Sequence, residues 1–124
     1  EAEWIAEQAR DTARGQLLVL ARTKKYLEAL ADALAERGVE ARTLRAKDAP
    51  TPSDPLLLAT LHRAKGLEAP RVIIAGRHLV PLRYHGGGDE RYRALWERKE
   101  RSLLYVGMTR ARDWCGIAGK GEVK

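Results

Sequence analysis

The sequence holds a single cysteine, Cys115, and no phenylalanine among its 124 residues. A lone cysteine excludes an internal disulfide and a zinc site built from several cysteines, and it is typical of a reducing compartment. No apolar run approaches the roughly 18 residues that a membrane-spanning helix needs, and no secretory signal opens the chain. These absences predict a soluble, cytoplasmic protein without a membrane segment, in which the Cys115 thiol is buried in a strand and inert.

The apolar content is nevertheless sufficient for one compact domain, because 44% of the residues are hydrophobic and 32% are charged. The net charge of +6 is unevenly distributed. Residues 1–62 carry nine basic and ten acidic side chains, whereas residues 63–124 carry fourteen basic and seven acidic ones. A one-sided basic surface favours polyanions such as nucleic acid or nucleotide phosphates, although basic residues often only solvate a face.

Short apolar runs alternate with segments of helical periodicity. Residues 17–21 are apolar throughout, which is typical of a strand buried on both faces of a parallel sheet. Thr23 is placed to cap a helix in which Leu27 and Leu34 share one stripe. Such patterns predict strands at residues 17–21, 39–44, 56–61, 71–76 and 114–118, and helices at residues 1–14, 24–37 and 89–106.

Alternating strands and helices predict an α/β fold, a three-layer α/β/α sandwich with a mainly parallel sheet whose ligands gather at the carboxyl ends of the strands. Residues 46–55 contain three prolines and predict a connecting loop. Residues 63–69 predict a turn, and the three glycines at 86–88 predict a hinge or loop tip. We expect residues 1–14 to form a connecting helix in a piece cut from a longer protein, and residues 15–124 to form the domain.

Two segments contain the polar and charged residues expected of a ligand-binding site. Residues 60–68 read TLHRAKGLE and follow a predicted strand, and residues 103–112 read LLYVGMTRAR and precede the last one. We expect both segments at the ligand-binding edge of the sheet. Together they closely resemble motifs V and VI of the UvrD/Rep-like superfamily 1 DNA helicases, and the resemblance extends from about Trp4 to Ala118. It implies the second RecA-like, P-loop NTPase-like motor domain of an ATP-driven motor on single-stranded DNA.

Arg110 matches the motif VI arginine, and the resemblance implies that it reaches the γ-phosphate of ATP as an arginine finger. A fixed guanidinium stabilises the charge that develops on the transferring phosphoryl oxygens, with effects of roughly 10³–10⁵ in rate. The alternative for Arg110 is a solvated side chain at a helix end, where the helix dipole favours a cation. Arg112, two positions on, is interpreted as a structural residue or a phosphate contact.

Glu68 matches the glutamate that contacts the ATP ribose in the family. A carboxylate can accept hydrogen bonds from two sugar hydroxyls, but an acid in the first turn of a short helix is also favoured by the dipole. Lys65 and Gly66 lie just before it and are predicted to bind nucleotide as well. The glycine permits a tight turn, and the lysine can pair with a phosphate or with an acidic neighbour.

The same resemblance implies single-stranded DNA contacts for Thr60, His62, Thr23 and Lys24. Arg63 stands where relatives vary, and we expect it to bind the DNA by adding attraction for a phosphate. If the strand continues through Thr60 and His62, both side chains point to one side. Their hydroxyl, imidazole and cationic groups suit a phosphate backbone. Thr23 has the additional interpretation of a helix cap, and Lys24 stands where many relatives carry Asn.

Other sites are not supported by the sequence. There is no G-x-x-x-x-G-K-[ST] motif, no acidic pair for magnesium and no metal-ligand spacing among the three histidines. We therefore expect no metal site within the chain, and ATP with Mg²⁺ to be shared with a first RecA-like motor domain in cis. The chain alone should be inactive. The three tryptophans, Trp4, Trp96 and Trp114, are expected to pack in the core, although Trp96 could line a partner surface.

Two departures from the family pattern stand out. Ala69 follows the motif V glutamate, where relatives commonly carry an aromatic residue, and residues 46–55 are short where many relatives carry a large accessory domain. An alternative function is a stand-alone, non-catalytic RecA-like module that binds nucleic acid or a protein partner. A reading frame that begins near Glu1 would favour that module, and an upstream phosphate-binding loop would favour the motor. Steep loss of binding with salt would indicate phosphate contacts.

Overall fold

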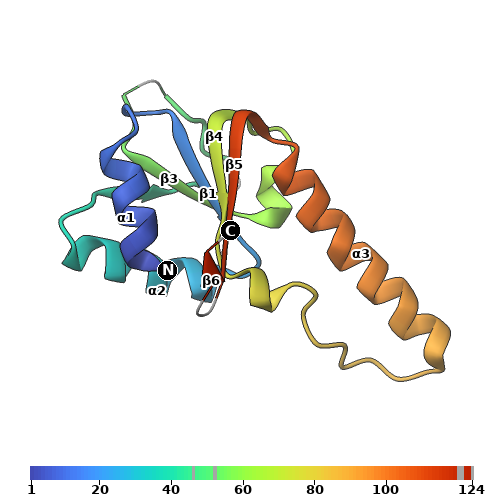
Figure 1. The fold of residues 1–124 in the computed structure, drawn as a ribbon. Helices are drawn as coiled ribbons and strands as arrows, with labels where there is room; N and C mark the ends of the chain where they lie inside the picture. Colours follow the sequence, from blue (N-terminus) through green and yellow to red (C-terminus); the bar gives the residue numbers. More distant parts are fainter. Residues whose placement is uncertain (46, 52, 120–121, 124) are drawn as a thin grey trace.

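The computed structural model describes the chain except residues 46, 52, 120, 121 and 124, and for residues 122–123 it describes the backbone only. Five parallel strands form the sheet in the order β2-β3-β1-β4-β5, and a short sixth strand runs antiparallel to β5. Figure 1 shows α1 and α2 on one side of this sheet and α3 on the other. The predicted three-layer α/β/α fold is confirmed. The strands are β1 (Leu17–Ala21), β2 (Ala41–Thr43), β3 (Leu56–Thr60), β4 (Ala69–Ile74), β5 (Ala111–Gly119) and β6 (Glu122–Val123).

β1 lies at the centre of the sheet and is buried along its whole length. Leu18 and Leu20 face a core cluster shared with α3 (Glu90–Met108) and the 3₁₀ helix η1 (Leu61–Ala64). Val19, between them, faces a second cluster shared with α1 (Ala2–Arg10) and α2 (Lys24–Glu36). The apolar run at 17–21 is therefore a strand buried on both faces, as the sequence predicts.

The other strands begin or end at residues other than those predicted, because pairing between strands does not stop where the apolar residues stop. β4 begins at Ala69, before the predicted start, and pairs there with Ala111 ahead of a register shift. β5 includes the exposed residues Arg112 and Asp113, which an apolar pattern does not reveal. β2 is shorter than predicted, and β3 ends at Thr60. β6 was not predicted, because two residues carry no pattern.

Side-chain caps define the starts of two helices. Thr23 Oγ1 accepts a hydrogen bond from the Tyr26 N–H at 3.1 Å, and Asp89 Oδ1 accepts one from the Arg91 N–H at 2.9 Å. The predicted caps are confirmed at both positions. α1 ends at Arg10 rather than at residue 14, and its side chain Ile5 is completely buried. A second 3₁₀ helix, η2 (Arg77–Leu79), follows β4.

The tryptophans divide between the core and the periphery. Trp4 and Trp114 lie 6.1 Å apart and pack against the cluster beneath α1 and α2, with the Arg71 guanidinium 4.5 Å from the Trp114 ring. Trp96 lies outside both clusters and donates its indole N–H to the Leu82 carbonyl at 2.8 Å. The core prediction is thus wrong for Trp96. No helix within the described part of the chain is long and apolar enough to cross a membrane.

Candidate functional site

A groove with a volume of about 760 Å³ runs along the carboxyl ends of β2 and β3 and the start of α2. Four of the five predicted DNA contacts line it, namely Lys24, Thr60, His62 and Arg63. Because parallel strands all end at the same edge of a sheet, residues that follow different strands meet there. The remaining lining residues are Leu27, Glu28, Thr43, Leu44 and Arg45.

Thr60 and His62 reach this groove by a different geometry from the predicted one. β3 ends at Thr60, whose Oγ1 accepts a hydrogen bond from the Arg63 N–H at 3.3 Å and so caps η1. The strand alternation assumed for these two side chains is therefore wrong. A 3₁₀ turn directs Leu61 into the core, where it is 1% exposed, and leaves His62 on the surface.

Thr23 and Lys24 begin α2 next to the groove. The Thr23 hydroxyl oxygen is engaged as the helix cap, and the side chain is not among those that line the groove. Lys24 does line it, is exposed, and has no hydrogen-bond or ion-pair partner within the described residues. The DNA contact expected of Thr23 stays a prediction.

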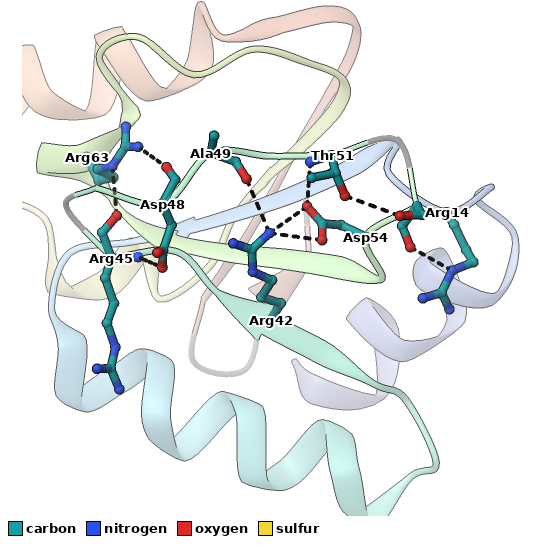
Figure 2. Close-up of polar contacts among 9 residues, drawn as sticks. Arg14, Arg42, Arg45, Asp48, Ala49, Thr51, Asp54 and Arg63 are labelled. Carbon is teal, nitrogen blue, oxygen red and sulfur yellow. Dashed lines mark hydrogen bonds and ion pairs between the residues drawn. The ribbon is translucent and has the colours of Figure 1, made fainter.

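Arg63 holds a neighbouring backbone segment. Its Nε donates to the Arg45 carbonyl at 3.3 Å and its Nη2 donates to the Asp48 carbonyl at 2.6 Å, as Figure 2 shows. Two of its N–H groups are thereby directed at protein oxygens. A phosphate bound to Arg63 would have to use the remaining donors of the guanidinium.

Glu68 and Arg110 lie together at the opposite edge of the sheet. The Arg110 carbonyl accepts a hydrogen bond from the Ala69 N–H at 3.2 Å, so the two chain segments are adjacent. Arg112 Nε is 4.0 Å from Glu68 Oε1, and both side chains are more than half exposed. An exposed pair at this distance contributes little to stability, which leaves the carboxylate available to a ligand.

The Arg110 side chain is partly exposed and folds along its own helix end. Its Nε donates to the Val106 carbonyl at 3.2 Å, and its Nη2 donates to Thr109 Oγ1 at 3.1 Å. These contacts hold Nε and Nη2 in place, and the other N–H groups of the guanidinium remain free to bind a ligand. Arg110 is not walled off from the segment that bears Glu68.

The expectation that both motif segments gather at the carboxyl edge is only half correct. Residues 60–68 start there, but residues 103–112 lead into β5 and finish at the amino edge, beside the start of β4. A residue that precedes a strand lies at the opposite edge from one that follows it. Across a strand of five residues the two edges are about 16 Å apart.

Lys65 and Gly66 lie on the connection between the two edges. Gly66 has φ +93, a backbone conformation that side chains strongly disfavour, and the space where a Cβ would point is open. The turn itself, rather than a close neighbour, requires the glycine. Lys65 lines a cavity of about 600 Å³ between η1 and α3.

An ion pair that was not predicted from the sequence lines the same cavity. Arg22, the residue after β1, donates from Nε to Glu100 Oε1 at 2.8 Å and from Nη2 to Oε2 at 2.9 Å. Oε1 also accepts the Leu82 N–H at 2.8 Å, and Glu100 is only 2% exposed. Burial raises the pKa of Glu100, but the hydrogen bonds from Arg22 and Leu82 outweigh it and hold that pKa below its ordinary value of 4.5.

The spacing of the buried residues in α3 indicates that Glu100 needs a charged partner. The buried residues of α3 are Glu100, Leu104 and Gly107, at positions i, i+4 and i+7. An acid on the buried stripe of a helix needs a cation or several donors nearby. The signal does not say which cation, because Arg22 is 78 positions away in the sequence.

Among the described residues, neither a metal site nor a reactive cysteine is supported. No group of three His, Cys, Asp or Glu side chains among them could hold a metal ion. Cys115 is partly buried rather than fully buried, and burial raises the pKa of its thiol, which disfavours the reactive thiolate.

Comparison with solved structures establishes the fold class. The C-terminal domain of a possible DNA helicase from Lactobacillus plantarum WCFS1 matches 99% of this chain and 68% of its own, with 22% identity and a TM-score of 0.70. The C-terminal domain of the DEAD-box protein Dbp5 matches 96% of this chain and 68% of its own, with 14% identity and a TM-score of 0.57. The Pyrococcus furiosus Hef helicase domain matches 98% of this chain but 25% of its own, with 15% identity and a TM-score of 0.51.

These likenesses show that the chain shares its α/β fold with the C-terminal domains of helicases. The sequence narrows this to a family, because residues 43–117 match the UvrD-like helicase C-terminal domain. The chain belongs to that family. No curated protein matches the chain.

Proposed function

We propose that this chain is the second motor domain of an ATP-dependent DNA helicase or translocase, in which it supplies an arginine finger and grips single-stranded DNA. The observation that carries the proposal is the course of residues 60–68. They begin in a cationic groove at one edge of the sheet and end beside Arg110 at the other. One continuous segment therefore joins a candidate strand-binding surface to a candidate nucleotide-binding surface.

The amino edge has the chemistry of half a nucleotide site. Arg110 would stabilise charge on the γ-phosphate, and the exposed Glu68 carboxylate would accept hydrogen bonds from the ribose. Lys65 and Gly66 are further candidates for nucleotide contact. The sequence contains no phosphate-cradling motif. ATP with Mg²⁺ would thus bind between this edge and a first RecA-like motor domain, which would provide the metal ligands and the phosphate loop.

The carboxyl edge would bind the strand. Lys24, Thr60 and His62 line one groove, and the lysine and threonine can contact phosphate oxygens without reading the bases. Closure of the two motor domains around ATP would move this groove relative to the strand contacts of the other domain. Alternation between open and closed states then gives translocation.

The test compares two proteins. The 124-residue chain with saturating single-stranded DNA should release no phosphate from ATP, because it lacks the partner half of the site. In a protein that joins this chain to its first motor domain, Arg110→Ala should lower ATP turnover by roughly 10³-fold or more. Arg101→Ala, which removes an exposed arginine from α3, is the matched control and should leave turnover unchanged.

Two outcomes would contradict the proposal. One is ATP turnover by the purified chain that Arg110→Ala abolishes, since the chain would then carry a complete site. The other is full turnover by the Arg110→Ala variant of the joined protein, since Arg110 would then have no role in phosphoryl transfer.

A further inference from the structure

Residues 45–54, which connect β2 to β3, lie beside the proposed DNA groove, and residues 46 and 52 among them are outside the described part of the chain. We propose that Arg45, which lines the groove from this connection, is an additional phosphate-binding residue for the single strand. The inference rests on the proposed function and deepens it. It also assigns Arg63 a positioning role that differs from the predicted phosphate contact.

One end of the segment is fixed by a buried carboxylate. Asp54, 8% exposed, accepts hydrogen bonds from Arg42 Nη1 at 2.9 Å and 2.8 Å and from the Thr51 N–H at 2.6 Å. The same Arg42 nitrogen donates to the Ala49 carbonyl at 3.3 Å. Figure 2 shows this cluster spanning the segment from Ala49 to Asp54. The segment is therefore tied to β2 through the Arg42 side chain.

The backbone of Arg45 is held on both sides. Its N–H donates to Asp48 Oδ2 at 2.8 Å, and its carbonyl accepts from Arg63 Nε at 3.3 Å. Arg63 also binds the Asp48 carbonyl, so one guanidinium anchors both ends of this turn. Arg63 comes from η1, which follows β3, the strand that pairs with β2. The residue that motif V places after His62 thus connects η1 to the turn that bears Arg45.

The Arg45 side chain is left without an internal partner. It is exposed, it lines the groove, and its guanidinium has no hydrogen bond or ion pair within the described residues. In Figure 2 it extends away from the contacts of the turn and toward α2. Lys24 lines the groove from that helix. The backbone of Arg45 is already fixed and its guanidinium donors are free, so binding an anion would require ordering of the side chain only.

The charges of the groove favour a phosphate backbone as its occupant. Lys24 and Arg45 approach from two walls and His62 from the floor, whereas Glu28 is the one acid in the lining. An unpaired strand offers one negative charge per nucleotide and so can meet cations on both walls. Contacts of this kind carry no sequence information, so the strand would be bound irrespective of its bases.

The test uses the 124-residue chain and a fluorescently labelled oligothymidine, with binding followed by anisotropy between about 50 and 200 mM salt. Arg45→Ala should weaken binding about five- to tenfold at low salt and reduce the magnitude of the log–log salt slope by about 0.7, the value for one lost contact to a single strand. Lys47→Ala is the matched control. It removes an exposed cation of the same segment that does not line the groove and should leave the slope unchanged.

A second variant separates positioning from direct contact. Arg63→Gln removes the anchoring charge while it keeps donors for the two carbonyls, and it should retain most of the affinity. Arg63→Ala should weaken binding as much as Arg45→Ala, and the double variant should be no weaker than Arg63→Ala alone, because Arg45 would already be misplaced. Additive losses in the double variant would overturn the positioning role of Arg63.

The two levels of the hypothesis fail differently. Loss of binding in Lys24→Ala together with unchanged binding in Arg45→Ala would overturn this inference and leave the proposed function standing. Unchanged binding in both variants, or a wild-type chain that does not bind the strand, would overturn the DNA groove itself. Circular dichroism of each variant tests whether the fold is retained, as expected for the exposed positions Lys24 and Arg45.

Discussion

At the scale of single residues, the buried ion pair between Arg22 and Glu100 connects segments that are distant in the sequence. It joins the end of β1, the segment that contains Leu82, and α3 through one carboxylate. A buried ion pair is costly to break, because the remaining charge has no partner and little water. Its value to the fold lies in this penalty for misassembly more than in net stabilisation.

We expect Glu100→Gln to lower the free energy of unfolding by about 3 kcal/mol at neutral pH, because it leaves the Arg22 guanidinium unpaired at 11% exposure. Urea unfolding of the purified chain measures this change. Glu97→Gln, which removes the same charge from the same helix away from Arg22, is the matched control and should cost under about 0.5 kcal/mol. Equal stability of the two variants would show that the pair is not coupled to folding.

The pH dependence follows from the lowered pKa of Glu100. A carboxyl whose folded pKa lies below its unfolded value stabilises the protein fully above the unfolded value, here 4.5, and loses that contribution as the pH falls through the folded value. The stability gap between wild type and Glu100→Gln should therefore be constant near neutrality and shrink below about pH 4.5. Arg22 and the nearby His62 are the charges that face this carboxylate. A gap that widens on acidification would contradict the assignment.

At the scale of elements, the position of α3 depends on a glycine, Gly107, which has no side chain. A Cβ on Gly107 would lie 2.6 Å from Leu61 Cδ2 and 3.1 Å from Ile74 Cδ1, both in the core cluster beneath the helix. The glycine costs helix propensity, but it allows α3 to approach η1 and β4 closely. That approach sets the position of Arg110 three residues later.

Gly107→Val should therefore destabilise the chain by roughly 1–3 kcal/mol through overpacking, even though it removes a flexible residue from the helix. Thermal unfolding followed by circular dichroism measures the loss. Ser102→Val introduces the same β-branched side chain at an exposed position of α3 and should change stability by less than about 1 kcal/mol. If both variants unfold at the same temperature, the close approach of α3 does not depend on Gly107.

At the scale of the whole molecule, the charge distribution and the sheet together define two separate surfaces. The net charge is +6, and the groove at the carboxyl edge collects cations from three elements that are distant in the sequence. The Arg110 and Glu68 surface lies at the other edge. Residues 60–68 run between the two edges and pass beneath α3, where Leu61 lies under Gly107.

We expect the wild-type chain to bind single-stranded DNA with a log–log salt slope of about −1.4, because Lys24 and Arg45 would each contact a phosphate and contribute about 0.7. Anisotropy titrations across a salt series measure the slope. Association that is insensitive to salt would favour the alternative of a protein-binding module, since an interface dominated by apolar contacts releases few counterions.

Much of the fold could be predicted from local sequence patterns. The apolar run of β1, the caps at Thr23 and Asp89 and the stripe of α2 depend on neighbours within a few positions. The starts of β4 and β5 could not be predicted, because their first residues are held by pairing between strands rather than by apolar side chains. The same reason hides β6, whose two residues exist as a strand only against the end of β5.

The roles of the candidate site residues stay predictions, whereas their arrangement can be compared with the structure. The resemblance to helicase motifs V and VI singled out Thr60, Glu68 and Arg110, and both motif segments were expected at one edge of the sheet. The structure separates Thr60 from the other two, because Arg110 precedes a strand and Thr60 follows one. Arg45 had no signal at all, since its role depends on a turn closed by a side chain 18 positions away.

The amino-acid sequence alone therefore determined the α/β class, the buried central strand, the helix starts and the chemical groups available for binding, because each follows from short-range periodicity and residue chemistry. Tertiary structure alone decided which of those groups face one another. Arg22 meets Glu100, Arg63 meets the backbone of Arg45, and Glu68 lies beside Arg110 only after parallel strands have been brought into register. Pairings across such distances depend on the packing of the whole sheet, which no local pattern specifies.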